Sequence, residues 1–138
     1  MNIAEEIIIT GSVLTALGVI VAAAKGEASH SEGSSLALSD YTHSEGYKTI
    51  ANSAYQHVQG KFNIRDTENK YAHIVGNGTS DDARSNAHTL DWNGNAWYAG
   101  SIEAVNGLIV KSSTEGSSKR FKITVDDNGT ISATELIQ

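Results

Sequence analysis

The sequence contains no cysteine and no proline, and only 10 of its 138 residues are Lys or Arg. The absence of cysteine excludes disulfides. The few cationic residues are scattered and the formal net charge is −6. This argues against nucleic acid as the main partner, because such partners favour clustered Lys and Arg.

Large aliphatic residues are scarce in the region 26–60, which holds only Leu36, Leu38, Ile50 and Val58. A single chain can hardly bury enough apolar surface there to offset roughly 1–2 kcal/mol of backbone entropy per residue. We therefore expect this region to be either disordered or stabilised by repetition and by other chains.

One long uncharged run is present, from Ile7 to Ala24, with Glu5 and Glu6 before it and Lys25 after it. Its length reaches the lower range of a transmembrane helix, and it resembles the first membrane span of a small phage holin. The alternative is a helix buried in the core of an oligomer, with charges at its ends that suit the helix dipole. A third possibility is that the segment is not native to the domain behind it. Residues 1–25 are thus predicted to be an apolar helical segment, either membrane-span-like or buried in a trimer.

An internal repeat occupies residues 26–76. A His precedes a Gly by three residues in four successive copies. The repeated histidines are His30, His43, His57 and His73, and the repeated glycines are Gly33, Gly46, Gly60 and Gly76. The steps between successive histidines are 13, 14 and 16 residues by their numbers. A unit of about 14 residues suits one coil of a β-solenoid, with Gly at each turn because it takes positive φ without penalty.

The pattern SHSEG followed by THSEG resembles the head repeats of trimeric autotransporter adhesins and related repeats in phage tail proteins. The resemblance implies a left-handed parallel β-roll in which three chains pack around one axis. Because the third and fourth copies lose the Glu and the Ser before it, we expect the solenoid itself to end near Gly60.

The C-terminal half resembles tail proteins of phages that infect Gram-positive bacteria, through NAHTLDWNGNAWYAG and the ending KRFKITVDDNGTISATELIQ. Three Asn-Gly pairs, at residues 93–94, 106–107 and 128–129, indicate β-hairpins. In the last case Phe121, Ile123 and Val125 alternate with polar residues, which predicts one apolar face. The predicted fold is all-β: an elongated trimer with a β-roll over 26–76 and hairpins over 77–138.

The repeated histidines invite a metal interpretation, but their common period indicates the same structural position on successive coils. Around a three-fold axis they would form stacked rings that can bind ions. No cysteine accompanies them and no HExxH spacing exists, so we predict neither a metal site nor a cofactor.

Trp92, Trp97 and Tyr98 form an aromatic group that could stack on sugar rings, and they are the predicted receptor-binding residues. The alternative is that they fill the interior of a trimer. No nucleophile elbow, P-loop or paired-carboxylate site stands out, so we predict no catalytic residues and no enzyme activity.

The resemblances imply a structural and host-attachment component of a phage tail, located in the virion and acting at the host surface. Its expected partners are its own copies in a homotrimer, other tail proteins, and a surface glycan or cell-wall component. Two alternatives stay open: a bacterial trimeric adhesin head, and a membrane-active holin-like segment fused to tail sequence.

Overall fold

The computed structural model describes residues 22–137, and they divide into one unit that ends at Gly100 and another that begins at Ser101. All regular structure in this range is β, in agreement with the predicted class. Residues 1–21 of the predicted N-terminal helix lie outside the described residues. At the end of that segment Ala23–Ala24 form a strand, β1, because their backbone pairs in parallel with the first repeat.

No helix within residues 22–137 is long and apolar enough to cross a membrane.

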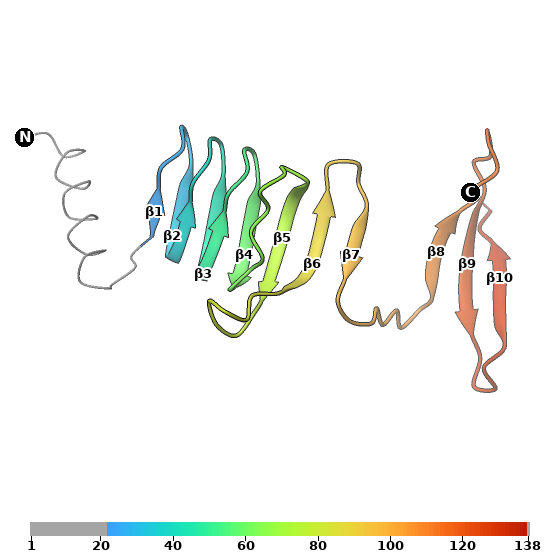
Figure 1. Ribbon diagram of the computed structural model, residues 1–138. Coiled ribbons are helices and arrows are strands. Elements are labelled where there is room, and N and C mark those ends of the chain that lie inside the picture. Colours follow the sequence, from blue (N-terminus) through green and yellow to red (C-terminus); the bar gives the residue numbers. More distant parts are fainter. Residues whose placement is uncertain (1–21, 138) are drawn as a thin grey trace, which may run out of the picture. The chain divides into compact units, whose positions relative to one another are not determined.

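The first unit contains a seven-stranded sheet in which spatial order follows chain order (Figure 1). After β1, its strands are β2 (His30–Ala37), β3 (His43–Ala51), β4 (His57–Lys61), β5 (Tyr71–Asn77), β6 (Asn86–Asp91) and β7 (Ala96–Tyr98). The pairs from β1 to β5 are parallel, and the last two pairs are antiparallel. Parallel neighbours separated by one short coil make a β-solenoid of about four turns.

The repeat sets the register of the solenoid. His30 pairs with His43, His43 with His57, and His57 with His73. The expectation that the solenoid ends near Gly60 was wrong, since Gly60 pairs with Gly76 on β5. Parallel pairing is made by the backbone, so losing Glu from a copy does not end the stack.

The repeated glycines form a ladder of close backbone approaches inside the strands. Gly33, Gly46 and Gly60 have φ of 74°, 104° and 95°, as predicted, whereas Gly76 is not among the positive-φ residues. A Cβ on any of the first three would lie within 3.0 Å of the carbonyl oxygen of the next glycine. Their predicted place in the turns between coils was wrong, because Gly33 and Gly46 lie within β2 and β3.

The turns between coils are instead made by other residues in the left-handed region. Ala28, Tyr41 and Tyr55 have φ of 48°, 56° and 61° at equivalent positions. The rings of Tyr41 and Tyr55 stack with centroids 5.2 Å apart. Ring stacking therefore accompanies a backbone conformation that L-residues seldom adopt.

The interior of the solenoid is small and largely polar. Its buried hydrophobic residues are Ala37, Ile50, Ala51, Val58 and Ile74. Ser35 donates to the Ser44 carbonyl at 2.7 Å, and the Ser44 and Thr49 hydroxyls lie 3.1 Å apart. Short hydroxyl side chains thus find partners both within a coil and on the backbone of the next coil, as burial of polar groups requires.

The second unit is a three-stranded antiparallel sheet of β8 (Leu108–Lys111), β9 (Arg120–Val125) and β10 (Ile131–Glu135). The hairpins predicted at Asn93-Gly94 and at Asn128-Gly129 are confirmed as the β6–β7 and β9–β10 connections. The hairpin predicted at Asn106-Gly107 was wrong. That pair makes a turn, with Gly107 N donating to Ala104 O at 3.2 Å, but the residues before it form no strand.

The register of this sheet collects most of its apolar side chains on one face, with Ile109 on the other. Leu108 is opposite Ile123, Val110 is opposite Phe121, and Ile131 is opposite Val125. Residues directly opposite each other share a face, and alternate residues along a strand share it too. The predicted alternation is therefore present, yet no described residue from 101 to 137 is buried.

Candidate functional site

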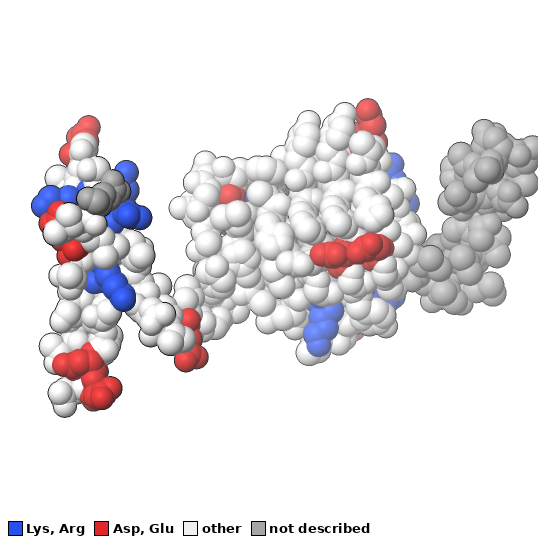
Figure 2. Space-filling view, turned by 180° about the vertical axis from the view of Figure 1, so that it is seen from behind, with Lys and Arg blue, Asp and Glu red and all other residues white. Residues whose placement is uncertain are grey.

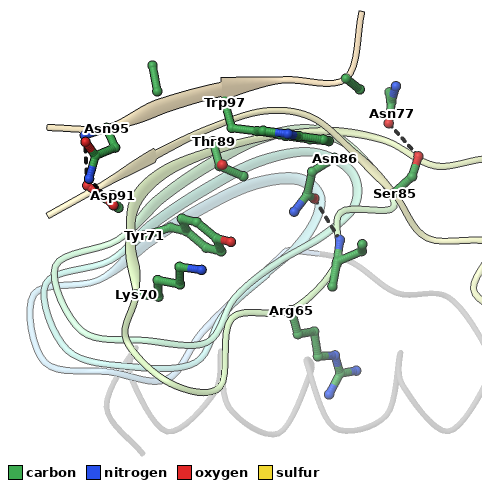
Figure 3. Close-up of a pocket in the computed structure, with 13 residues that line it drawn as sticks. Arg65, Lys70, Tyr71, Asn77, Ser85, Asn86, Thr89, Asp91, Asn95 and Trp97 are labelled. Atoms are coloured by element: carbon green, nitrogen blue, oxygen red, sulfur yellow. Dashed lines mark hydrogen bonds between the residues drawn. The ribbon is translucent and has the colours of Figure 1, made fainter. Parts of the chain in front are cut away.

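A cleft of about 590 Å³ lies where the β6–β7 hairpin joins the last coil of the solenoid. Figure 3 shows the Trp97 indole on one side and Tyr71 and Lys70 on the other. The polar side chains at its ends form two pairs, Asp91 with Asn95 and Asn77 with Ser85. The lining is completed by Ile64, Arg65, Asn86, Thr89, Ala96 and Ala99.

The hairpin turn holds the Asp91 carboxylate in one orientation. Its Oδ1 accepts hydrogen bonds from the backbone N–H groups of Asn93 and Asn95, both at 2.9 Å, and its Oδ2 accepts one from Asn95 Nδ2 at 2.9 Å. These bonds, led by the one from the Asn95 side chain and assisted by the charge of Lys70, lower the pKa of Asp91. The group is therefore a fixed, ionised acceptor at the mouth of the cleft.

The opposite wall is built from the end of the solenoid. Asn86 Oδ1 accepts a hydrogen bond from Ile64 N at 2.9 Å, which ties the loop after the third coil to β6. Lys70 Nζ lies 5.2 Å from the centroid of the Tyr71 ring. The cleft thus combines an aromatic wall with amide, carboxylate and ammonium groups, the arrangement that fixes small polar ligands.

The structure divides the predicted aromatic group. Trp97 pairs with Thr89 and lines the cleft, whereas its neighbour Tyr98 pairs with His88 and points to the opposite face of β7. Trp92 lies in the hairpin turn and does not line the cleft. Trp92, Trp97 and Tyr98 are 48%, 55% and 48% exposed, so the single chain does not bury any of them.

Tyr98 closes a second feature, which we call the imidazole ladder and define as His30, His43, His57, His73 and His88. Successive ring centroids lie 5.0, 4.6, 5.3 and 5.6 Å apart, and the His88 ring is 4.5 Å from that of Tyr98. The expectation of one structural position on successive coils is thereby confirmed for the four repeated histidines.

Sequence reasoning missed His88 and most of the cleft. His88 is outside the His-to-Gly spacing because it reaches the ladder through the antiparallel β5–β6 pair, where it lies opposite Val75. Asp91 and Asn95 flank an Asn-Gly turn, and turn chemistry explains their presence without any ligand. The available sequence signal for the cleft was Trp97 itself, and a single aromatic residue in a short strand is too weak to define a cleft.

Comparisons with protein-family models, with curated proteins and with solved structures give no match to this chain.

Proposed function

We propose that this chain is a non-catalytic attachment protein of a phage tail, in which a homotrimer binds a glycan or another cell-wall component of the host surface. The observation that carries the proposal is the cleft beside Trp97, where an exposed indole lies next to fixed polar groups. Its volume of about 590 Å³ is in the range of a ligand site for a small molecule, such as one or two sugar rings.

The chemistry of the lining favours a carbohydrate. The flat face of an indole packs against the C–H groups of a sugar ring, and the hydroxyls of the ring need acceptors and donors at the edge. Asp91 offers an ionised acceptor, and Lys70 and Arg65 offer donors. An uncharged, hydroxyl-rich ligand satisfies all of these groups together.

The same lining supports binding without chemistry. Asp91 is the single carboxylate among the described residues of the cleft, and the hydrogen bonds from Asn93 and Asn95 hold its pKa low. Glycoside hydrolysis ordinarily needs two carboxyl groups, one of them protonated to act as the acid. The lining therefore fits retention of a sugar better than its cleavage.

The proposal of a trimer rests on the second unit. Its apolar face carries Leu108, Val110, Val125 and Ile131, which are between 44% and 72% exposed. Large apolar side chains left in contact with water on one face are unfavourable, and such a face commonly marks an interaction surface. Three copies that turn this face toward a common axis would close a core, as a cyclic oligomer does, and would present three clefts to one surface. Three weak sites on one target raise avidity without any new contact.

The test compares Trp97→Ala with Trp92→Ala, because both side chains are about half exposed and only Trp97 lines the cleft. Purified protein is incubated with intact host cell walls, and both the retained protein and the released sugar are measured. We expect Trp97→Ala to reduce retention at least about tenfold, because each of several sites loses a stacking contact. Retention of Trp92→Ala should be close to that of the parent chain.

Equal retention of both variants would remove the cleft from the proposal. Release of oligosaccharide in proportion to protein concentration would make the chain an enzyme. Loss of retention together with a lower melting temperature for both variants would mean that the tryptophans fill a trimer interior instead.

The assignment to a phage tail has its own test. If the chain is a tail component, mass spectrometry of purified virions detects it with other tail proteins, and antibodies against it label the tail in electron micrographs. Its detection in bacterial cell envelopes that carry no phage would favour an adhesin of the host instead.

A further inference from the structure

The first two coils place a carboxylate beside each of the first two rings of the imidazole ladder. The segment His-Ser-Glu-Gly occurs in β2 and again in β3, and the two copies pair in register, Glu32 with Glu45. His and Glu two residues apart on a strand point to the same face. Figure 2 shows acidic side chains gathered in a short strip across the coils of this unit.

Two like charges on adjacent strands are unfavourable unless a cation compensates them. The third and fourth copies carry Gln59 and Val75 at this position, so the juxtaposition is confined to the first two coils. The residue two positions after each glutamate lies on the same face of the strand. It is Ser34 in β2 and Tyr47 in β3, so neither position supplies a Lys or Arg.

The ring between the two carboxylates has an unsatisfied nitrogen. Ligand atoms of Glu32, His43 and Glu45 all lie within 4.8 Å of one another. His43 Nε2 is shielded from solvent and has no hydrogen-bond partner among the described residues. A buried polar atom without a partner is unfavourable, and a cation bound at this nitrogen would remove the penalty.

The neighbouring histidines flank the same carboxylates. His30 Nε2 lies 3.6 Å from Glu32 Oε2, and His57 Nε2 lies 3.4 Å from Glu45 Oε1. His57 Nε2 is likewise shielded and has no hydrogen-bond partner in the part of the chain that the structure describes. Both rings therefore lie beside the two carboxylates, on either side of His43 along the ladder.

We propose that Glu32, His43 and Glu45 form a binding site for a divalent transition-metal ion of the zinc type. One imidazole nitrogen and two carboxylate oxygens suit Zn²⁺, whereas Mg²⁺ and Ca²⁺ prefer oxygen ligands alone. Ligands of one Zn²⁺ at about 2.0–2.2 Å can be at most about 4.4 Å apart, so the three atoms need only a small side-chain movement. A site with three protein ligands keeps an open position for water or for another group.

The proposed role of the ion is to clamp the first two coils. It would join β2 to β3 through side chains. These two strands have no ion pair between an acidic residue and a Lys or Arg that could do the same. An ion that binds the folded chain alone stabilises it by mass action.

The test is a calorimetric titration of the full chain with Zn²⁺, after removal of metal by a chelator. We expect saturable binding of one ion per chain. Glu32→Gln and Glu45→Gln should each weaken it at least about tenfold, because even a second-layer partner is worth 10–100-fold. His88→Gln is the matched control, since it removes a ladder imidazole with no acid beside it, and it should bind as the parent does.

The two glutamate variants decide the matter without disturbing the ladder, because neither glutamate stacks on a ring or lies in the interior. Absence of saturable Zn²⁺ binding would overturn the proposal. So would binding that both glutamate variants retain in full, which would assign the ion to other histidines. Equal affinity for Mg²⁺ or Ca²⁺ would show an oxygen-only site and would remove His43 as a ligand.

Discussion

The solenoid and the C-terminal sheet both pair their backbone N–H and C=O groups between strands, but they cover their side chains differently. Each coil of the solenoid lies on the next, and this stacking buries both small apolar and hydroxyl-bearing residues within one chain. The C-terminal sheet has comparable strands and one face that is mostly apolar, yet none of its described residues is buried. The solenoid therefore covers its own side chains, whereas the apolar face of the C-terminal sheet stays exposed in the single chain.

The difference shows what repetition supplies to a chain that is poor in large aliphatic residues. In the solenoid each coil is the cover of its neighbour, so a few residues such as Val58 and Ile74 suffice as a core. The C-terminal sheet has more large aliphatics per residue, but nothing within its own unit lies over them. A sheet of this kind needs a second layer, and copies of the same chain are the proposed source.

The largest expected effect is the loss of the proposed trimer when a charge is placed on the apolar face of the C-terminal sheet. Val110 and Ile109 are adjacent on β8, 44% and 59% exposed, and they point to opposite faces. Val110→Asp places a charge on the apolar face and should convert a particle of three chain masses into one of a single mass. Ile109→Asp, on the face shared with Lys122, should leave the mass unchanged.

Light scattering at several protein concentrations measures this outcome. A parent chain that already runs as a folded monomer would contradict the trimer. Equal masses for the two variants would mean that the apolar face is not the interface.

The second prediction tests the claim that coils of the solenoid cover one another. A Cβ on Gly46 would collide with the carbonyl oxygen of Gly60, whereas one on Gly94 would meet nothing within 4 Å. Both glycines have positive φ, 104° and 84°, so they share the left-handed strain of about 1–2 kcal/mol. Gly46→Ala should add about 1–3 kcal/mol for displaced backbone, and the difference between the variants isolates the close approach.

Urea denaturation at a fixed chain concentration measures both variants, because the stability of an oligomer depends on concentration. Equal losses would show that the coils can separate at the glycine ladder without cost, and the solenoid would then not be held by close stacking.

The third prediction concerns the polar interior. Asn63 is fully buried, and its side chain accepts from Ile50 N at 2.7 Å and donates to Ile50 O at 3.1 Å. The Asn63 side-chain amide thus makes the two hydrogen bonds that the backbone of a neighbouring strand would otherwise make to Ile50. Asn63→Ala should cost about 2 kcal/mol or more, because it leaves a buried N–H and C=O without partners.

Asn86→Ala is the control, because its Oδ1 makes the equivalent bond to Ile64 N at an exposed position where water can substitute. We expect a loss of about 1 kcal/mol or less for it. A loss as large as that of Asn63→Ala would indicate that burial does not set the cost of these side-chain bonds.

The solenoid was predictable because its information is local and repeated. A Gly and a His at a fixed offset are visible in the sequence, and the register of the strands follows from their period. The length difference between coils was harder to interpret. Lys48, with φ of 57°, is an additional residue in the second coil, and it shifts the pairing between Ser34 and Leu36. A repeat with such an insertion gives unequal steps between its histidines, although all four copies remain visible in the sequence.

The cleft was not predictable for a physical reason. It arises where parallel pairing changes to antiparallel pairing, at β5 and β6, and this change brings Tyr71 near Trp97 across a hairpin. No period connects those residues. The aromatic group at 92–98 was visible as composition, but strand alternation separates Trp97 from Tyr98, and alternation requires the strand to be known first.

The smallest expected effect concerns the imidazole ladder, where His73 contributes to stability in a pH-dependent way. Burial lowers the pKa of His73 from its ordinary 6.5, and the neighbouring His57 and His88 lower it further, while Glu45 opposes the shift. A lowered pKa means that the unfolded chain binds this proton more readily than the folded chain. The contribution is therefore complete above pH 6.5 and is lost as the pH falls through the lowered folded pKa.

The melting temperature of the parent chain should accordingly decrease between about pH 7 and pH 5, and His73→Gln should make that decrease shallower. His30→Gln is the control at the exposed end of the ladder, where the side chain is 65% exposed, and it should keep the slope of the parent. The scans are run with a chelator present, since an ion held at His43 would add a pH dependence of its own. A parent melting temperature that rises on acidification would mean that the stacked rings favour a shared positive charge, and the carboxylates of Glu32 and Glu45 would then be the stabilising partners of the ladder.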